Sequence, residues 1–183
     1  MKKKSFVMVL ALVLVFAVAV GGVVAWLTDK TDPVKNTFTV GDINITLTEE
    51  AGKDANYQFK MVPGNTITKD PKVTVVGGSE ACWLFVKVEK TANFDTFMTY
   101  AMADGWTELP GVSGVYYREV AANANNQDFN VLKDNQVTVK GEVTKTQLEA
   151  VKTINQPTLT FTAYAVQKDN VGSAAEAWEI ASK

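Results

Sequence analysis

Histidine is missing from this sequence of 183 residues, and only one cysteine, Cys82, is present. The absence of histidine removes the side chain that most often serves as a general base and as a metal ligand. A single cysteine excludes a disulfide within the chain. These absences argue against a secreted hydrolase that depends on a Ser-His-Asp set or on a histidine-bound zinc ion. The sequence therefore predicts a protein that is not an enzyme and that binds no cofactor.

The common signatures of catalytic and nucleotide-binding sites are absent too, including HExxH, GxSxG, the phosphate loop and the dinucleotide fingerprint. Glu49 and Glu50 are adjacent carboxylates, but their polar surroundings indicate a solvated surface rather than an acid-base pair. Asp29 and Asp32, with Asp42 beyond them, carry oxygen atoms suited to a hard cation. Because no EF-hand spacing accompanies them, we expect an ordinary polar arm and no metal site.

Charge also limits the partners of the chain. Acidic residues outnumber basic residues by 20 to 18. Three of the basic residues, Lys2, Lys3 and Lys4, belong to the first segment, and its removal would leave 15 basic residues and a net charge of −5. A body of this charge is not expected to bind nucleic acid or an anionic membrane surface through bulk charge.

The first 25 residues have the pattern of a signal peptide. Three lysines precede Phe6–Val20, which is apolar and uncharged, and Val23 and Ala25 are the small residues that a signal peptidase reads. Cleavage after Ala25 would make Trp26 the first residue of the mature protein. The alternative is an uncleaved anchor, because Phe6–Leu27 is just long enough to span a bilayer. We expect cleavage, and thus a secreted protein that touches the membrane only through the uncleaved segment.

Residues 26–37 predict an extended arm, because Pro33 interrupts them and the residue before a proline avoids the helical region. Residues 38–183 predict one folded domain with many short strands separated by turn signals. The expected strands are 38–40, 43–47, 57–61, 72–76, 82–89, 115–120 and 158–166. The fold class that this pattern favours is all-β, a jelly-roll-like antiparallel β-sandwich with a few short helices, preceded by a signal peptide helix.

The strand expected at 82–89 has the strongest pattern, with apolar residues on both faces at its start and charged residues at its end. Leu84, Val86 and Val88 share one face, and Trp83, Phe85, Lys87 and Glu89 share the other. Such a strand is buried at one end and exposed at the other. In the strand at 158–166, the residues expected to face inward are Leu159, Phe161, Ala163 and Ala165.

Turn and helix signals fill the rest of the domain. Asp134-Asn135 predicts a two-residue hairpin turn between strands at 131–132 and 136–140. A short helix is expected at 146–151, with Thr144 as its N-cap. A second is expected at 173–180, with Ser173 and Glu176 in a capping-box arrangement. Residues 94–102 fit a helix or a strand equally well.

Cys82 and four aromatic residues are the remaining candidates for a site. The thiol could be reactive, but its apolar neighbours favour a buried and inert group. Trp106, Tyr116, Tyr117 and Trp178 could form a sugar-binding surface, although aromatics in an all-β domain more often serve packing.

Several segments, taken in order, resemble the TasA and camelysin family of exported proteins of Gram-positive bacteria. The first three of these segments are AWLTD at 25–29, NTFTVGDI at 36–43 and VPGNTITK at 62–69. Further along the chain lie DGWT at 104–107, GVYYR at 114–118 and AYAVQ at 163–167. The resemblance covers most of the chain, and the order of the segments carries it.

The resemblance implies a jelly-roll fold, cleavage by a dedicated SipW-type signal peptidase, and a structural role outside the cell. Members of the family build biofilm matrix fibres, so the implied location is the cell surface or the biofilm matrix of a Gram-positive bacterium. The implied partners are further copies of the chain, with other matrix components as additional candidates.

In such fibres, the N-terminal segment of one subunit pairs as a strand with the next subunit. The resemblance assigns this donor role to the arm and its first strand residue: Trp26, Leu27, Thr28, Val34 and Phe38. An exposed sheet edge accepts an added strand through backbone hydrogen bonds. Pro33 lies within this arm and removes one backbone donor. The alternative hypothesis is a monomeric binding module or adhesin of the cell surface that uses aromatics such as Trp106 and Tyr117.

Overall fold

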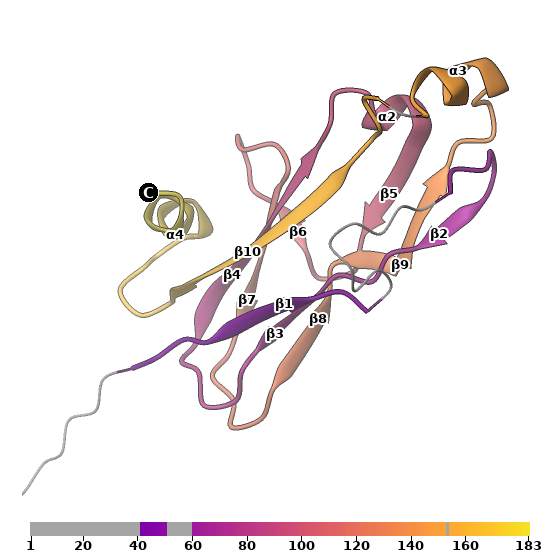
Figure 1. Cartoon of the computed structure of the whole chain (residues 1–183). Helices are drawn as coiled ribbons and strands as arrows, with labels where there is room; N and C mark the ends of the chain where they lie inside the picture. The colour runs from indigo at the N-terminus through magenta and orange to yellow at the C-terminus, as the bar shows by residue number, and fades with distance from the viewer. Residues whose placement is uncertain (1–40, 51–59, 153) are drawn as a thin grey trace, which may run out of the picture. The chain divides into compact units, whose positions relative to one another are not determined.

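The computed structural model of the protein describes residues 41–50, 60–152 and 154–183. The expected signal peptide, the arm, the strand at 38–40 and residues 57–59 of another expected strand lie outside these ranges. Figure 1 shows the described strands and helices. In chain order they are β1 (Ile45–Thr48), β2 (Thr66–Thr68), β3 (Lys72–Val75), β4 (Cys82–Lys90), α2 (Phe94–Phe97), β5 (Met98–Met102), β6 (Thr107–Glu108), β7 (Val115–Val120), β8 (Gln127–Asn130), β9 (Leu132–Val139), α3 (Lys145–Ala150), β10 (Leu159–Gln167) and α4 (Ala174–Ala181).

The strands form three antiparallel sheets, ordered β1-β3-β8, β10-β4-β7-β6 and β2-β9-β5. Two short connections link the first and the third sheets. β2 leads into β3, and β8 leads into β9 with Val131 as the single residue between them. At this crossing, the N–H of Val131 donates to the carbonyl of Pro71 at 2.9 Å, and that of Lys69 donates to the carbonyl of Asn135 at 2.8 Å. The all-β class predicted from the sequence is confirmed.

The sheets β1-β3-β8 and β10-β4-β7-β6 pack against each other through a shared hydrophobic core. Val73 and Val75 of β3 and Leu84 and Val86 of β4 are all fully buried in it. The residues of β10 that were predicted to face inward, Leu159, Phe161, Ala163 and Ala165, pack against the same cluster. The alternation expected for this strand is therefore confirmed.

The central strand β4 is buried on both faces. Its other face carries Trp83 and Phe85, which pack beneath helix α4 with the buried Ala177. The ring of Trp178 lies 5.4 Å from that of Phe85 and 5.2 Å from that of Tyr164. The last two residues of β4 are exposed, so the predicted change from a buried to an exposed end is confirmed.

Both expected helices in the second half of the chain are present with their predicted N-caps. Thr144 forms a full capping box with Gln147 at the start of α3. Ser173 accepts the N–H of Glu176 at 3.2 Å in α4, but the Glu176 carboxylate accepts from the N–H of Gly172 instead of Ser173. The capping box predicted for α4 is thus only half formed.

The hairpin predicted at Asp134-Asn135 is wrong. Leu132 and Val139 begin and end one continuous strand, β9, and the expected turn residues lie inside it. Both residues have a φ of +54°. Two-residue hairpin turns require the same positive φ, and the same residue types favour both structures. Here the register with β5 shifts between Tyr100 and Met102, so the pair forms a bulge within β9 of the third sheet.

Other short elements also differ from expectation. Residues 94–102, which fitted a helix or a strand equally well, contain both, because α2 is followed directly by β5. Lys60 and Met61 are the two described residues of the strand expected at 57–61, and neither of them lies in a strand. Strands β2, β6 and β8 were not predicted, since they are short and polar and show no strong alternation.

The bulge in β9 gives a test of backbone strain. Asp134 is exposed, so replacing its side chain changes little besides the cost of a positive φ. We expect Asp134→Ala to lower the free energy of unfolding by about 1 kcal/mol, and Asp134→Gly to lower it less or to raise it. Urea unfolding of the two variants measures this difference. Equal stability of the alanine and glycine variants would contradict a strained left-handed residue at this position.

Candidate functional site

One lateral side of the two facing sheets, between β8 and β7, is closed by side chains. The segment between β5 and β6 crosses here and brings in Trp106, which is buried. Its indole N–H donates to the carbonyl of Asn130 at 2.8 Å. The guanidinium of Arg118 lies 4.0 Å from the ring centre of Phe129 and 5.4 Å from that of Trp106. Burial of this guanidinium lowers the pKa of Arg118.

On the other lateral side, β1 and β10 are the outermost strands that the structure describes. Strand β1 is the edge of its sheet and β10 is the edge of the facing sheet. In Figure 1 the two strands run next to each other, and their residues are in contact. No described strand pairs with the outer edge of either one. This side therefore differs from the side that Trp106 closes.

The register of the ladders shows which backbone groups point to the free edges. The N–H of Lys168 donates to the carbonyl of Ala81 at 2.8 Å, so every second residue of β10 counted back from there bonds to β4. The N–H and C=O groups of the residues between them, Phe161, Ala163 and Ala165, point away from β4. Within the described ranges, none of these groups has a hydrogen-bond partner.

The same reasoning applies to β1. The N–H of Val76 donates to the carbonyl of Asn44 at 2.9 Å, so the backbone groups of Ile45 and Leu47 point away from β3. They too lack a hydrogen-bond partner among the residues that the structure describes. Two rows of unpaired backbone groups thus flank the gap between β1 and β10, over an apolar interior. We call this feature the β1–β10 groove.

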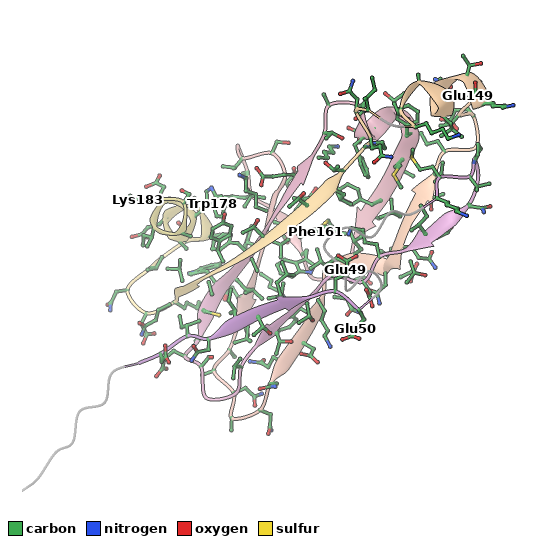
Figure 2. The ribbon with its side chains drawn as sticks, in the orientation of Figure 1. Glu49, Glu50, Glu149, Phe161, Trp178 and Lys183 are labelled. Atoms are coloured by element: carbon green, nitrogen blue, oxygen red, sulfur yellow. The ribbon has the colours of Figure 1, made fainter. Side chains whose placement is uncertain are left out.

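The β1–β10 groove contains a cavity of about 310 Å³ at the C-terminal end of β1. Its apolar walls come from both sheets, and Leu47 is 37% exposed there. Figure 2 shows the labelled Phe161 and Glu49 at this gap, one on β10 and the other just beyond β1. The residues that line the cavity are Leu47, Thr48, Glu49, Lys69, Pro71, Leu159, Thr160 and Phe161.

Charged side chains form the rim of the cavity. The Lys69 ammonium donates to both carboxylate oxygens of Glu49, at 2.8 and 2.9 Å. The same ammonium lies 5.5 Å from the ring centre of Phe161, which joins the rim to β10. The Glu50 N–H donates to the Asp70 carboxylate at 3.1 Å. The prediction of a solvated Glu49 is wrong, since its side chain is 26% exposed and ion-paired, whereas Glu50 is exposed as predicted.

The residues predicted for cleavage and for the donor arm lie outside the described ranges. They are Val23, Ala25, Trp26, Leu27, Thr28, Val34 and Phe38, and the candidate cation ligands Asp29 and Asp32 lie outside them as well. Asp42 is described, and its carboxylate accepts from the amide of Asn44 at 2.8 Å. Among the described residues, no three His, Cys, Asp or Glu side chains gather in a group that could hold a metal ion.

The four candidate aromatics do not form one surface. Trp106 and Tyr116 belong to the core between the sheets, whereas Tyr117 and Trp178 pack in the cluster beneath α4. Neighbouring residues of β7 point to opposite faces of their sheet, which separates the two tyrosines. The packing interpretation of these residues is confirmed.

Comparison of the chain with models of known protein families, with curated proteins and with solved structures finds no match. The described helices include none that is long and apolar enough to cross a membrane.

Sequence reasoning missed the cavity because its lining comes from segments far apart in the chain. Glu49 follows β1, Lys69 lies between β2 and β3, and Phe161 belongs to β10, so the three residues meet only through the packing of the two sheets. The polar stretch around Glu49 is the single local signal, and such a stretch by itself predicts an exposed surface. The alternation of Phe161, Ala163 and Ala165 identified the inward face of β10 but not its free edge, because edges depend on strand order.

Cys82 is fully buried, and burial raises the pKa of its thiol to about 11. With this pKa, roughly one thousandth of the thiol is ionised at pH 8 in the folded protein. The thiolate is the reactive form, so the folded protein should react slowly. We expect Ellman's reagent to modify Cys82 only after denaturation, and at a normal rate in guanidinium chloride. Fast modification of the folded protein at pH 8 would contradict the buried position.

Proposed function

We propose that this chain is an exported structural subunit that assembles with copies of itself into extracellular fibres of a biofilm matrix or cell surface. The observation that carries this proposal is the β1–β10 groove, where two sheet edges leave backbone groups unpaired beside an apolar interior. The order of sequence segments that resembles the TasA and camelysin family supports the same role. A jelly-roll arrangement of the sandwich belongs to the proposal.

An added strand is the natural occupant of such a groove. Backbone groups at five positions point to it, from Ile45 and Leu47 on β1 and from Phe161, Ala163 and Ala165 on β10. Each new backbone hydrogen bond contributes about 1 kcal/mol net, so one bond at each of the five positions gives on the order of 5 kcal/mol before the cost of ordering the strand. Burial of Leu47 and the cavity walls adds to this. The gain suits repeated association of identical subunits.

The donor strand in this proposal is the arm Trp26–Phe38 of a second copy. Cleavage after Ala25 by a SipW-type signal peptidase frees it in the secreted protein. N-terminal sequencing of the protein recovered from culture medium tests that step, and Trp26 is the expected first residue.

The assembly test uses the mature protein, residues 26–183. We expect fibres by negative-stain electron microscopy and a sedimenting fraction that grows with concentration. Deletion of residues 26–35 should leave a folded monomer, because the described domain begins after the arm. A mature protein that stays monomeric over a wide range of pH and concentration would overturn the proposal.

Ala163→Pro tests the accepting edge. Its N–H points away from β4, so proline removes a donor to an added strand while the β10–β4 ladder stays intact. We expect unchanged secondary structure by circular dichroism and at least a tenfold loss of sedimentable fibre. Ala163→Ser, which keeps the N–H and the small side chain, is the matched control and should assemble like the unmodified protein. Equal assembly of the proline variant would exclude β10 as the acceptor.

A further inference from the structure

The β1–β10 groove has two different ends, and the chain enters the described domain at one of them. We propose that the arm of a second copy enters the groove at the opposite end, where the cavity lies, and runs parallel to β1 and antiparallel to β10. This inference rests on the proposed function, because it gives the direction of the donor strand in the same assembly.

Backbone contacts identify the two ends of the groove. The cavity marks one end, since its lining includes the last residues of β1 and the first residues of β10. At the other end, the N–H of Glu80 donates to the carbonyl of Asp42 at 3.0 Å, and the N–H of Lys168 donates to the carbonyl of Ala81 at 2.8 Å. Asp42 precedes β1 and Lys168 follows β10, so the two strands run in opposite directions along the groove. We call these ends the cavity end and the exit end.

Residues 41–44 lie at the exit end and continue the line of β1. The N–H of Asn44 donates to the Ser79 hydroxyl at 3.1 Å, and its carbonyl accepts from the N–H of Val76 at 2.9 Å. These contacts keep the segment beside the connection between β3 and β4. In Figure 1 the start of β1 lies away from the sheet β2-β9-β5. A chain that continues in this direction before Gly41 points away from its own groove and toward a neighbouring copy.

The direction of the donor strand decides between a fibre and a closed dimer. If the arm ran antiparallel to β1, the exit ends of two copies would face each other, and each arm would lie beside the other groove. Such reciprocal pairing is isologous and closes at two subunits. If the arm runs parallel to β1, the exit end of each copy faces the cavity end of the next. This heterologous contact repeats without closing, as a fibre requires.

Entry at the cavity end also suits the position of Pro33. The seven residues 26–32 span roughly 23 Å when extended, so they can pair along the groove without a proline. Pro33 then lies at the cavity end, outside the ladder, where no backbone donor is required. Pro33 and Val34 are apolar, and they meet apolar lining residues of the cavity there, Leu47 and Pro71.

The same arrangement limits the axial repeat of the fibre. Pro33 lies beside the cavity of the acceptor, and Thr48 lines the cavity of the donor's own domain. The fifteen residues from one to the other span at most roughly 50 Å when extended. A compact domain of this size is roughly 40 Å across, so such a repeat leaves room for each subunit. We expect electron micrographs of the fibres to show a repeat between these two lengths, and a clearly longer repeat would contradict this register.

Cross-linking between single cysteines tests the direction, because Cys82 is buried. Copies with Thr28→Cys or Lys35→Cys in the arm are mixed with copies that carry an acceptor cysteine. The acceptor variants are Asn44→Cys at the exit end and Thr48→Cys at the cavity end, and both positions are exposed. Assembly proceeds with a short bismaleimide, and a C-terminal tag on the acceptor copies separates mixed dimers from like pairs on a gel.

We expect Lys35→Cys to cross-link several-fold more with Thr48→Cys than with Asn44→Cys. Thr28→Cys should show the opposite preference. Unmodified protein, with only the buried cysteine, is the control and should not cross-link. The reversed pattern in fibres would overturn the proposed direction and leave the fibre proposal standing.

A double variant tests whether the arm fills the groove of its own chain. Lys35→Cys and Thr48→Cys are combined in one copy, and cross-linking is measured at a dilution where no fibres form. We expect no internal cross-link. An internal cross-link, without mixed dimers between single variants, would show a chain that folds back on its own β1. That result would overturn the second copy as the occupant of the groove.

The remaining outcomes separate this inference from the proposed function. Fibres that form without any mixed cross-link would overturn the groove as the accepting site, and with it the direction, but not assembly itself. A closed dimer with the reversed cross-links and no fibres would overturn both the direction and the fibre proposal. Absence of both fibres and mixed cross-links from the mature protein would also overturn both.

Discussion

Strand β4 is the element on which the rest of the described structure depends. It pairs with β10 on one side and β7 on the other, and both of its faces are buried. Its inner face packs against β3, so it holds the two sheets together, and Phe85 on its outer face holds α4. Because side chains alternate along a strand, one nine-residue segment serves both layers.

A sheet with a central strand also has edge strands. On the two sides of the facing sheets, the outward backbone groups of these edge strands are covered to different extents. The indole N–H of Trp106 bonds to an outward carbonyl of β8, and the ring-stacked Arg118 fills the space beside it. No described side chain covers the outward groups of Phe161 and Ala163 in the same way. Free edges favour unwanted pairing, so proteins usually cover them. Among the described residues, one side of the facing sheets is covered in this way and the other is not.

Much of this fold was predictable from local patterns. The alternation of Leu84 and Phe85 gave the faces of β4, and the caps at Thr144 and Ser173 gave the helix starts. Asp134-Asn135 misled because a positive φ serves a bulge as well as a hairpin turn, and only long-range pairing decides between them. The groove was not predictable for the same reason. Strand order sets which edges are free, and no local pattern encodes strand order.

The separation of donor and acceptor along the chain has a consequence for the timing of assembly. The groove needs both β1 and β10, which lie near opposite ends of the folded domain, so it is complete only when the domain has folded. The proposed donor arm stays joined to the expected signal peptide until cleavage after Ala25 frees it. A folded precursor would thus carry an acceptor without a competent donor. Under the proposed scheme, assembly would therefore begin with cleavage.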